Sequence, residues 1–159
     1  MQEGGSIRRH LAYPLILSQL VCRLFAADAF VGTWKLNAAK SKYTAGSAPR
    51  EETLIIQETG EQMQVAIIGV GPDGLSLASS YEVATKGGTS KAKGNLFDMV
   101  TAKRIDHTTL ELRFVKNGKA IRSVRSVLSK DGTTLTVTVL QGIDAQGKPV
   151  KGRSVFNRQ

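Results

Sequence analysis

Apolar and polar residues alternate with a period of two in short runs along almost the whole chain. Between residues 133 and 140, for example, Leu135, Val137 and Val139 alternate with threonines. Side chains two positions apart lie on the same face of a β-strand. No window of a dozen residues has the 3.6-residue period of an amphipathic helix. The alternation therefore predicts an all-β chain whose strands each have one apolar and one solvated face.

Glycine-bearing turns separate these runs and predict how the strands pair. The dipeptides Asp73-Gly74, Asn117-Gly118 and Asp131-Gly132 accept the positive φ of tight hairpins, which favours an antiparallel meander. The predicted strands are 30–36, 53–58, 62–68, 75–83, 99–105, 109–116, 119–128, 133–140 and 150–157, with a weaker strand within 91–97. A sandwich and an open sheet are alternatives, but closure removes exposed edges. We expect an up-and-down β-barrel of about 8 to 10 strands.

The N-terminal residues have the pattern of an export signal. Arg8 and Arg9 precede a mostly apolar stretch over 11–21, and Ala26-Ala27 supplies the small residues that signal cleavage requires. The apolar stretch is too short to span a bilayer comfortably, so no stable membrane insertion is expected. The sequence predicts a signal peptide over 1–27 and one domain over 28–159, exported to the periplasm or secreted.

The predicted domain contains few reactive side chains. Cys22 is the only cysteine, and with His10 it falls inside the predicted signal, which leaves His107 as the only imidazole. His107 follows Asp106 in a predicted turn, away from any obvious nucleophile. No group of His, Cys or carboxylate residues has the spacing of a metal site. We expect no enzyme, no metal and no cofactor; an enzyme built in a barrel cavity is the alternative.

The net charge of +9 favours contact with anionic partners. The basic residues nevertheless form no dense cluster, and the aromatic residues that could stack on bases are scattered. The composition therefore predicts a monomer that binds no nucleic acid.

Gly32-Thr33-Trp34 stands on the first predicted strand. This motif resembles the opening strand of lipocalins and fatty-acid-binding proteins, where the indole closes one end of a barrel. The whole domain is similar to bacterial exported lipocalin-like proteins, which open Gly-Thr-Trp-Lys-Leu-Asn, here residues 32–37. The resemblance implies a lipocalin-like barrel in which Gly32 and Trp34 determine packing. Arg158 is expected either to stack on the indole or to be a solvated terminus.

The stretch over 37–52 departs from the fatty-acid-binding proteins. Those proteins carry a helix-turn-helix lid after the first strand, whereas this stretch is polar, shorter and without an amphipathic pattern. We expect a loop with at most one helical turn and no lid. The resemblance implies a small apolar or amphipathic ligand inside the barrel. The alternative is a ligand-free structural or protein-interaction module of the cell envelope.

Two arginines on the predicted strand 119–128 bear on ligand binding. Arg122 and Arg125 are three positions apart and therefore lie on opposite faces, so one of them points inward if the strand is unbroken. An arginine in an apolar cavity must be paired, hydrated near a mouth or available to an anion. The resemblance to fatty-acid-binding proteins, where an arginine on the corresponding strand meets the ligand carboxylate, favours Arg125. A bulge or a position at the rim would instead leave both arginines in water. The predicted ligand contacts are Arg125, Arg122, Phe114 and Tyr81, with a carboxylate as a candidate head group.

Overall fold

The computed structural model describes residues 27–44, 47–144 and 146–159, so residues 1–26 of the predicted signal lie outside it. The described residues form eleven strands and one short 3-10 helix. The strands are β1 (Gly32–Leu36), β2 (Lys42–Tyr43), β3 (Glu51–Thr59), β4 (Gln62–Val70), β5 (Ser76–Ala84), β6 (Gly87–Gly94), β7 (Met99–Asp106), β8 (Thr109–Lys116), β9 (Lys119–Leu128), β10 (Thr134–Gly142) and β11 (Gly152–Arg158), and the helix is η1 (Ala38–Lys40).

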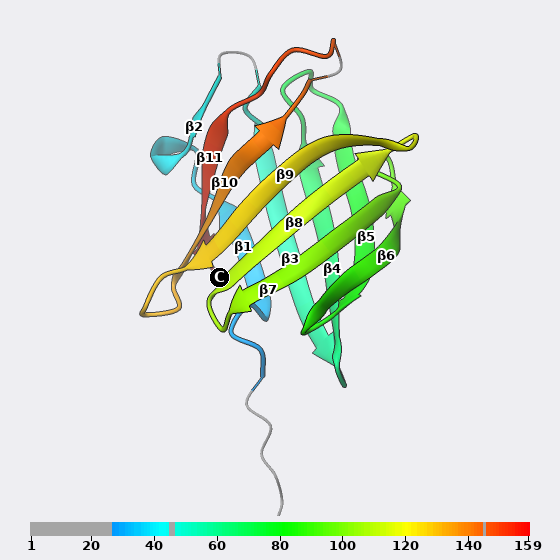
Figure 1. Cartoon of the computed structure of the whole chain (residues 1–159). Helices are drawn as coiled ribbons and strands as arrows, with labels where there is room; N and C mark the ends of the chain where they lie inside the picture. The colour runs from blue at the N-terminus through cyan, green and yellow to red at the C-terminus, as the bar shows by residue number, and fades with distance from the viewer. Residues whose placement is uncertain (1–26, 45–46, 145) are drawn as a thin grey trace, which may run out of the picture.

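Strands β3 to β11 follow one another as an antiparallel meander that β1 closes (Figure 1). On one side β1 pairs with β3, with Trp34 opposite Leu54. On its other side β1 pairs with β11, with Trp34 opposite Arg158. The short β2 also pairs with β11, beyond the end of β1. The helix η1 connects β1 to β2. The predicted all-β antiparallel barrel is confirmed, with ten strands in the closed ring.

The predicted strands differ from the observed ones mainly where the alternation is weak. Strands β8 and β9 have the predicted bounds, and the turn between them contains Asn117 and Gly118 at φ values of 50° and 73°. Strand β6 begins at Gly87, earlier than predicted, because its glycine-rich sequence carries no apolar alternation. The stretch over 37–52 contains η1, as one helical turn, and also β2, which was not predicted.

No helix among the described residues combines the length and the apolar character that crossing a membrane would require.

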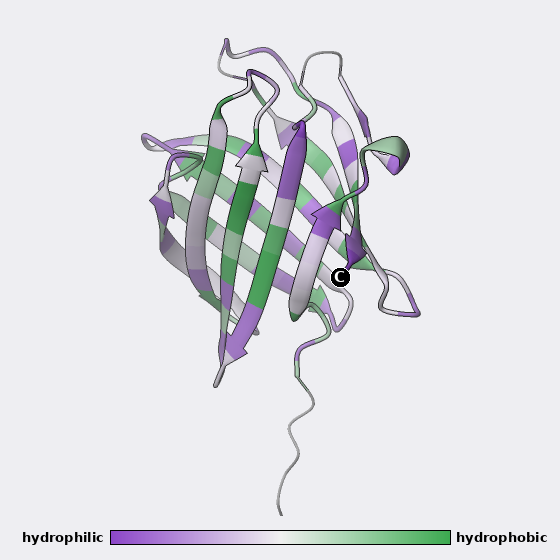
Figure 2. Cartoon of the chain, turned by 180° about the vertical axis from the view of Figure 1, so that it is seen from behind, coloured by the Kyte–Doolittle hydropathy of each residue, from purple (hydrophilic) through white to green (hydrophobic). Residues whose placement is uncertain are grey.

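The two ends of the barrel differ in how they are filled. At the lower end in Figure 1, which we call the closed end, large side chains are almost completely buried; they include Phe30, Trp34, Met63, Leu135 and Phe156. Toward the opposite end, which we call the mouth, Phe97, Val100 and Phe114 are buried, whereas other apolar side chains that pack on the core are only partly buried; these include Leu36, Ile121, Val137 and Val139. Figure 2 shows the alternation of apolar and polar residues along the strands. At the mouth the interior is therefore packed beside β7 and β8 and partly accessible to solvent beside β9 and β10.

Candidate functional site

The closed end is built around Trp34. Its side chain is fully buried, and its indole Nε1 donates a hydrogen bond of 2.9 Å to the carbonyl oxygen of Phe30. The guanidinium carbon of Arg158 lies 4.2 Å from the centroid of the Trp34 ring. A Cβ on Gly32 would lie 2.7 Å from Nη1 of Arg158, which explains why glycine stands here at a φ of +147°.

Arg158 also donates three hydrogen bonds to the backbone. Its guanidinium donates to the carbonyl oxygens of Gly132, Val31 and Ala29 at 2.7, 2.5 and 2.8 Å. Because these acceptors and the indole face occupy the guanidinium, the closed end is a packing arrangement that offers little to a ligand.

Arg125 lies on the outer face of the barrel. On the adjacent strand its Cα partner is Glu111, and Nε and Nη2 of Arg125 donate to Oε1 of Glu111 at 3.0 and 2.6 Å. The Arg125 side chain is 52% exposed. The choice of Arg125 as the inward-facing arginine is therefore wrong. The physical reason is that the buried side chains of Val124, Ser126 and Leu128 take the inner face of β9.

Arg122 lies on the inner side of β9, at the mouth. Its Cα partner on β8 is Phe114, which is buried in the core, and a bulge interrupts the β8–β9 register just before it. Arg122 is exposed to solvent, as the alternative of a rim position expected. No ion pair within 4 Å among the described residues involves Arg122. Its positive charge is thus on the barrel's inner side without a bound carboxylate.

Glu52 faces Arg122 from the far wall of the barrel. It lies on β3 two positions before the buried Leu54, and therefore on the inner face. Burial raises the pKa of Glu52 to about 7, and the charge of Arg122 partly opposes that rise. We did not predict Glu52 because the predicted strand began at residue 53. Extending the alternation by one residue would have placed Glu52 inside the barrel.

Tyr43 and Ser154 complete the polar group at the mouth. Tyr43 pairs with Gly152 across β2 and β11, and its phenol hydrogen-bonds with the hydroxyl of Ser154. Burial raises the pKa of Tyr43, and the nearby charge of Glu52 adds to the rise. We call Tyr43, Glu52, Arg122 and Ser154 the mouth cluster. It brings a phenol, a carboxyl, a guanidinium and a hydroxyl together at the open end of an apolar interior.

Tyr81 and Phe114, two of the predicted ligand contacts, lie on the inner face, with Phe114 directly opposite Arg122 on the neighbouring strand. Both are buried, and both pack against Phe97 with ring centroids 5.9 and 4.5 Å away. The rings of Tyr81 and Phe114 meet edge to face at 6.4 Å. Burial raises the pKa of Tyr81, so this phenol stays neutral at physiological pH. These three aromatic side chains form a buried cluster beside the mouth, which we call the aromatic cluster.

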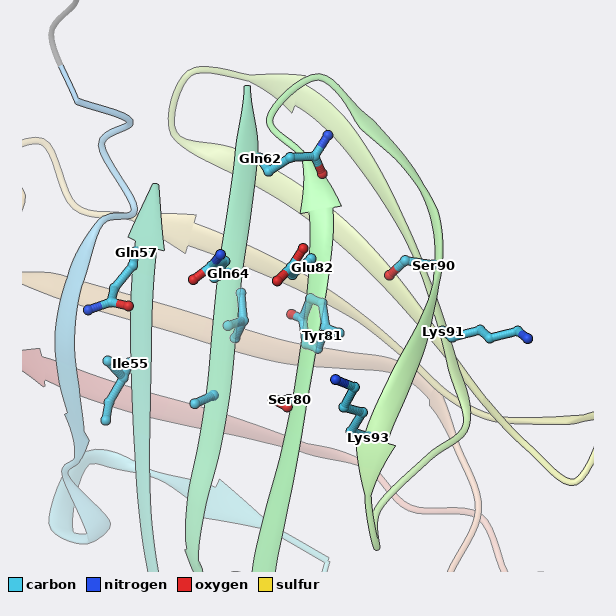
Figure 3. A pocket seen from close by; sticks show the side chains of 12 residues that line it. Ile55, Gln57, Gln62, Gln64, Ser80, Tyr81, Glu82, Ser90, Lys91 and Lys93 are labelled. Carbon is cyan, nitrogen blue, oxygen red and sulfur yellow. The ribbon is translucent and has the colours of Figure 1, made fainter. Parts of the chain in front are cut away.

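A hollow of about 620 Å³ lies on the outer side of β3 to β6 (Figure 3). Gln57, Gln64 and Glu82 line it in a row across neighbouring strands. Backbone pairing between β5 and β6 covers only Ser79–Tyr81 and Ala92–Gly94, so the two strands separate beyond it and Tyr81 borders the hollow from inside. Most of the lining side chains face outward. This hollow is therefore a polar groove in the wall and not the interior cavity that a small apolar ligand would need.

His107 is exposed in the turn between β7 and β8, at the closed end and far from the mouth cluster. Among the described residues, no three His, Cys, Asp or Glu side chains are grouped closely enough to hold a metal ion.

Comparison with known proteins identifies the architecture. No protein-family model and no curated protein sequence matches this chain. Among solved structures, a mutant of the fluorescent protein UnaG is similar over 82% of this chain and 96% of its own, with 19% identity and a TM-score of 0.51. The likeness shows a shared fold, a closed antiparallel β-barrel.

Two further solved barrels resemble the chain less closely. EF1p2_mFAP2b and the redesigned barrel mFAP1, both bound to DFHBI, each share 13% identity with it, at TM-scores of 0.46 and 0.45. They cover 82% and 84% of this chain, and the matches span 94% and 100% of theirs.

Proposed function

We propose that the protein is an exported, non-enzymatic carrier that holds a small amphipathic molecule in its barrel, with an acidic head group at the mouth cluster. Arg122 is the observation that carries the proposal. Arg122 lies on the inner side of β9 at the rim of the barrel and is exposed to solvent, with no carboxylate within ion-pair distance among the described residues. A solvated guanidinium at this position is free to exchange water for a ligand carboxylate, which it would bind through charge-assisted hydrogen bonds.

The interior offers an apolar path for the rest of the ligand. Leu36, Val137 and Val139 line the inner wall near the mouth and are only partly buried. The buried aromatic cluster of Tyr81, Phe97 and Phe114 lies on the other side of the mouth. A ligand whose tail covers these side chains would gain about 25 cal/mol for each Å² of apolar surface removed from water. The charged end would remain at the rim, beside Arg122.

The charge around the mouth also favours an acidic ligand. Loops and strand ends at this end carry several lysines, and the chain as a whole has a net charge of +9. These lysines are Lys40, Lys42, Lys116, Lys119, Lys148 and Lys151. A surplus of one sign of charge around an opening attracts ligands of the opposite sign and raises their association rate at low salt.

Glu52 gives the proposed site a pH dependence. Its pKa of about 7 means that the carboxyl holds its proton in mildly acidic solution and can donate a hydrogen bond to a ligand carboxylate. Above that pH the Glu52 carboxylate repels an anion instead. We expect carboxylate ligands to bind more tightly below pH 7 than above it.

The mouth cluster also meets one condition of the enzyme alternative, because Glu52 and Tyr43 both have raised pKa values at the same opening. Catalysis by a general base further requires a hydrogen bond to the proton that is removed. The Ser154 hydroxyl bonds to Tyr43, and no hydrogen bond joins it to Glu52, the group that would act as its base. We therefore propose binding without catalysis.

Paired arginine variants test the site. Fatty acids and their methyl esters would be offered to the wild type, to Arg122→Ala and to Arg125→Ala, and dissociation constants measured by fluorescence competition. Arg122→Ala should weaken fatty-acid binding about tenfold, a change of ~1.4 kcal/mol, and leave ester binding nearly unchanged. Arg125→Ala removes the same group from the outer face of the same strand, so it should change neither. Equal losses for acid and ester would contradict the proposed role of Arg122.

Native mass spectrometry before and after organic extraction tests the broader proposal. An extractable mass bound in one copy per barrel would support a carrier and reveal the class of its ligand. A bare barrel that also takes up no offered fatty acid would instead favour the alternative, a structural or protein-interaction module of the cell envelope.

A further inference from the structure

Asp28 is held to the closed end of the barrel from two sides. Its carboxylate forms a largely buried ion pair with Nη2 of Arg104 on β7, where the two side chains are 12% and 16% exposed. The same carboxylate accepts a hydrogen bond of 3.0 Å from the backbone N–H of Phe30. Arg104 is itself oriented by the carbonyl oxygen of Thr85 at 3.0 Å and by the Phe30 ring. Several independent contacts therefore determine the position of Asp28.

The backbone nitrogen of Asp28 points at a carboxylate. It donates a hydrogen bond of 2.8 Å to Oε2 of Glu58, which is partly buried on the inner face of β3, two positions after Ile56. In the described part of the chain, no Lys, Arg or His nitrogen lies within 4 Å of Glu58. Its one hydrogen-bond donor is thus a neutral backbone amide, which compensates a partly buried negative charge poorly.

The other charges around Asp28 do not make up this deficit. A hollow of about 560 Å³ beside Asp28 is bordered by Lys86, Arg104, Asp106 and His107. Arg104 is engaged by Asp28 itself, and the exposed Lys86 lies 3.9 Å from Glu61. Among the described residues, Glu58 is therefore a partly buried carboxylate with no cationic partner.

We propose that the peptide bond between Ala27 and Asp28 is cut and that Glu58 binds the new α-ammonium group of Asp28. A signal peptidase would hydrolyse this bond: water adds its hydroxyl to the carbonyl carbon of Ala27, and the released Asp28 amine takes up protons to become an ammonium. The amide hydrogen bond to Glu58 then becomes a charge-assisted one. The ammonium needs no new position, because Arg104 and Phe30 hold Asp28 in place.

Capture of the new ammonium by Glu58 is compatible with only one cleavage position. Ala26-Ala27 permits cleavage after either alanine. Only a cut after Ala27 places the ammonium at the nitrogen that is 2.8 Å from Glu58. A cut one residue earlier would move the charge along the chain by about 3.5 Å and leave the amide in place.

The first experiment identifies the mature N-terminus. The full chain would be expressed in a bacterium that exports it, and the purified protein analysed by intact mass and N-terminal sequencing. The expected mature chain starts at Asp28. A chain that starts at any other residue, or that is not cut, overturns the proposed position.

The second experiment tests the capture of the ammonium. Every strand of the barrel lies between Gly32 and Arg158, so a chain starting at Asp28 contains the whole closed sheet. Chains starting at Asp28 and at Ala26 would be compared, each with Glu58 and with Glu58→Gln. The Asp28 start should unfold about 3 to 5 °C higher than the Ala26 start when Glu58 is present. Glu58→Gln should abolish that difference, whereas Glu82→Gln on the outer face should leave it intact. A difference that persists in Glu58→Gln overturns the capture.

Discussion

The two ends of this barrel each place an arginine near the interior, but the surroundings of the two arginines differ completely. At the closed end Arg158 covers the Trp34 ring and donates to three backbone carbonyls. At the mouth Arg122 lies on the inner side of β9 with no ion pair within 4 Å among the described residues. The same chemical group is therefore structural where the fold satisfies it, and available to a ligand where the fold leaves it unpaired.

The neighbouring acids show the same contrast. Arg104 at the closed end pairs with Asp28 in a largely buried contact. At the mouth Glu52 is close enough to Arg122 for their charges to interact, yet burial still raises its pKa to about 7. A carboxyl group whose pKa is raised by burial lowers the stability of the folded protein at pH values above its ordinary pKa.

The strongest test of the closed end is Trp34→Ala. Removing this fully buried indole leaves a cavity and frees Arg158 from its aromatic partner. The free energy of unfolding should fall by about 3 to 5 kcal/mol, measured by urea denaturation. A fall below about 1 kcal/mol would show that the closed end does not depend on the indole.

The two arginines can be compared directly by truncation. Arg158→Ala removes the donors to three carbonyl oxygens and should lower the free energy of unfolding by about 2 kcal/mol. Arg122→Ala removes no hydrogen bond or ion pair of the described residues and should change it by less than about 0.5 kcal/mol. Similar losses of stability from both variants in urea would remove the distinction between the two ends.

The remaining prediction concerns Glu52, whose effect on stability is visible only as a dependence on pH. Its pKa is raised in the folded state, so between about pH 4.5 and pH 7 the folded protein holds a proton that the unfolded chain has released. Stability should therefore fall as the pH rises through this window, by roughly 1 to 3 kcal/mol, and then level off.

Glu52→Gln should remove that slope from the urea midpoints measured at each pH. Glu82→Gln, on the outer face of β5, is the matched control and should keep it. If the urea midpoint of Glu52→Gln still falls as the pH rises, a group other than Glu52 causes the pH dependence.

Much of the closed end could be predicted from the sequence, and little of the mouth. Gly32, Trp34 and the flanking alternation are neighbours along the chain, and a local pattern is enough to recognise them. The mouth cluster draws its members from β2, β3, β9 and β11. Strand β2 has only two residues, too few for any periodicity to show, and Glu52 stands at the very start of its strand.

The orientation of β9 could not be read from its residues. Ile121 and Val127 give one face of the strand an apolar character, and Val124 and Leu128 do the same for the other. The structure buries Val124 and Leu128 and leaves Val127 38% exposed, with a bulge in the β8–β9 register beside Ile121. That choice directs Arg125 outward and Arg122 to the inner side.

The sequence by itself determined that this chain forms antiparallel strands with one apolar face each, because side-chain alternation is a property of residues two apart. It also placed two arginines on opposite faces of one strand. Only the tertiary structure decided which arginine faces inward, and only barrel closure brought Glu52 and Tyr43 toward it. The physical reason is that burial and the interaction of charges depend on distances across the barrel. Those distances become short only when β1 pairs with β11 and closes the barrel.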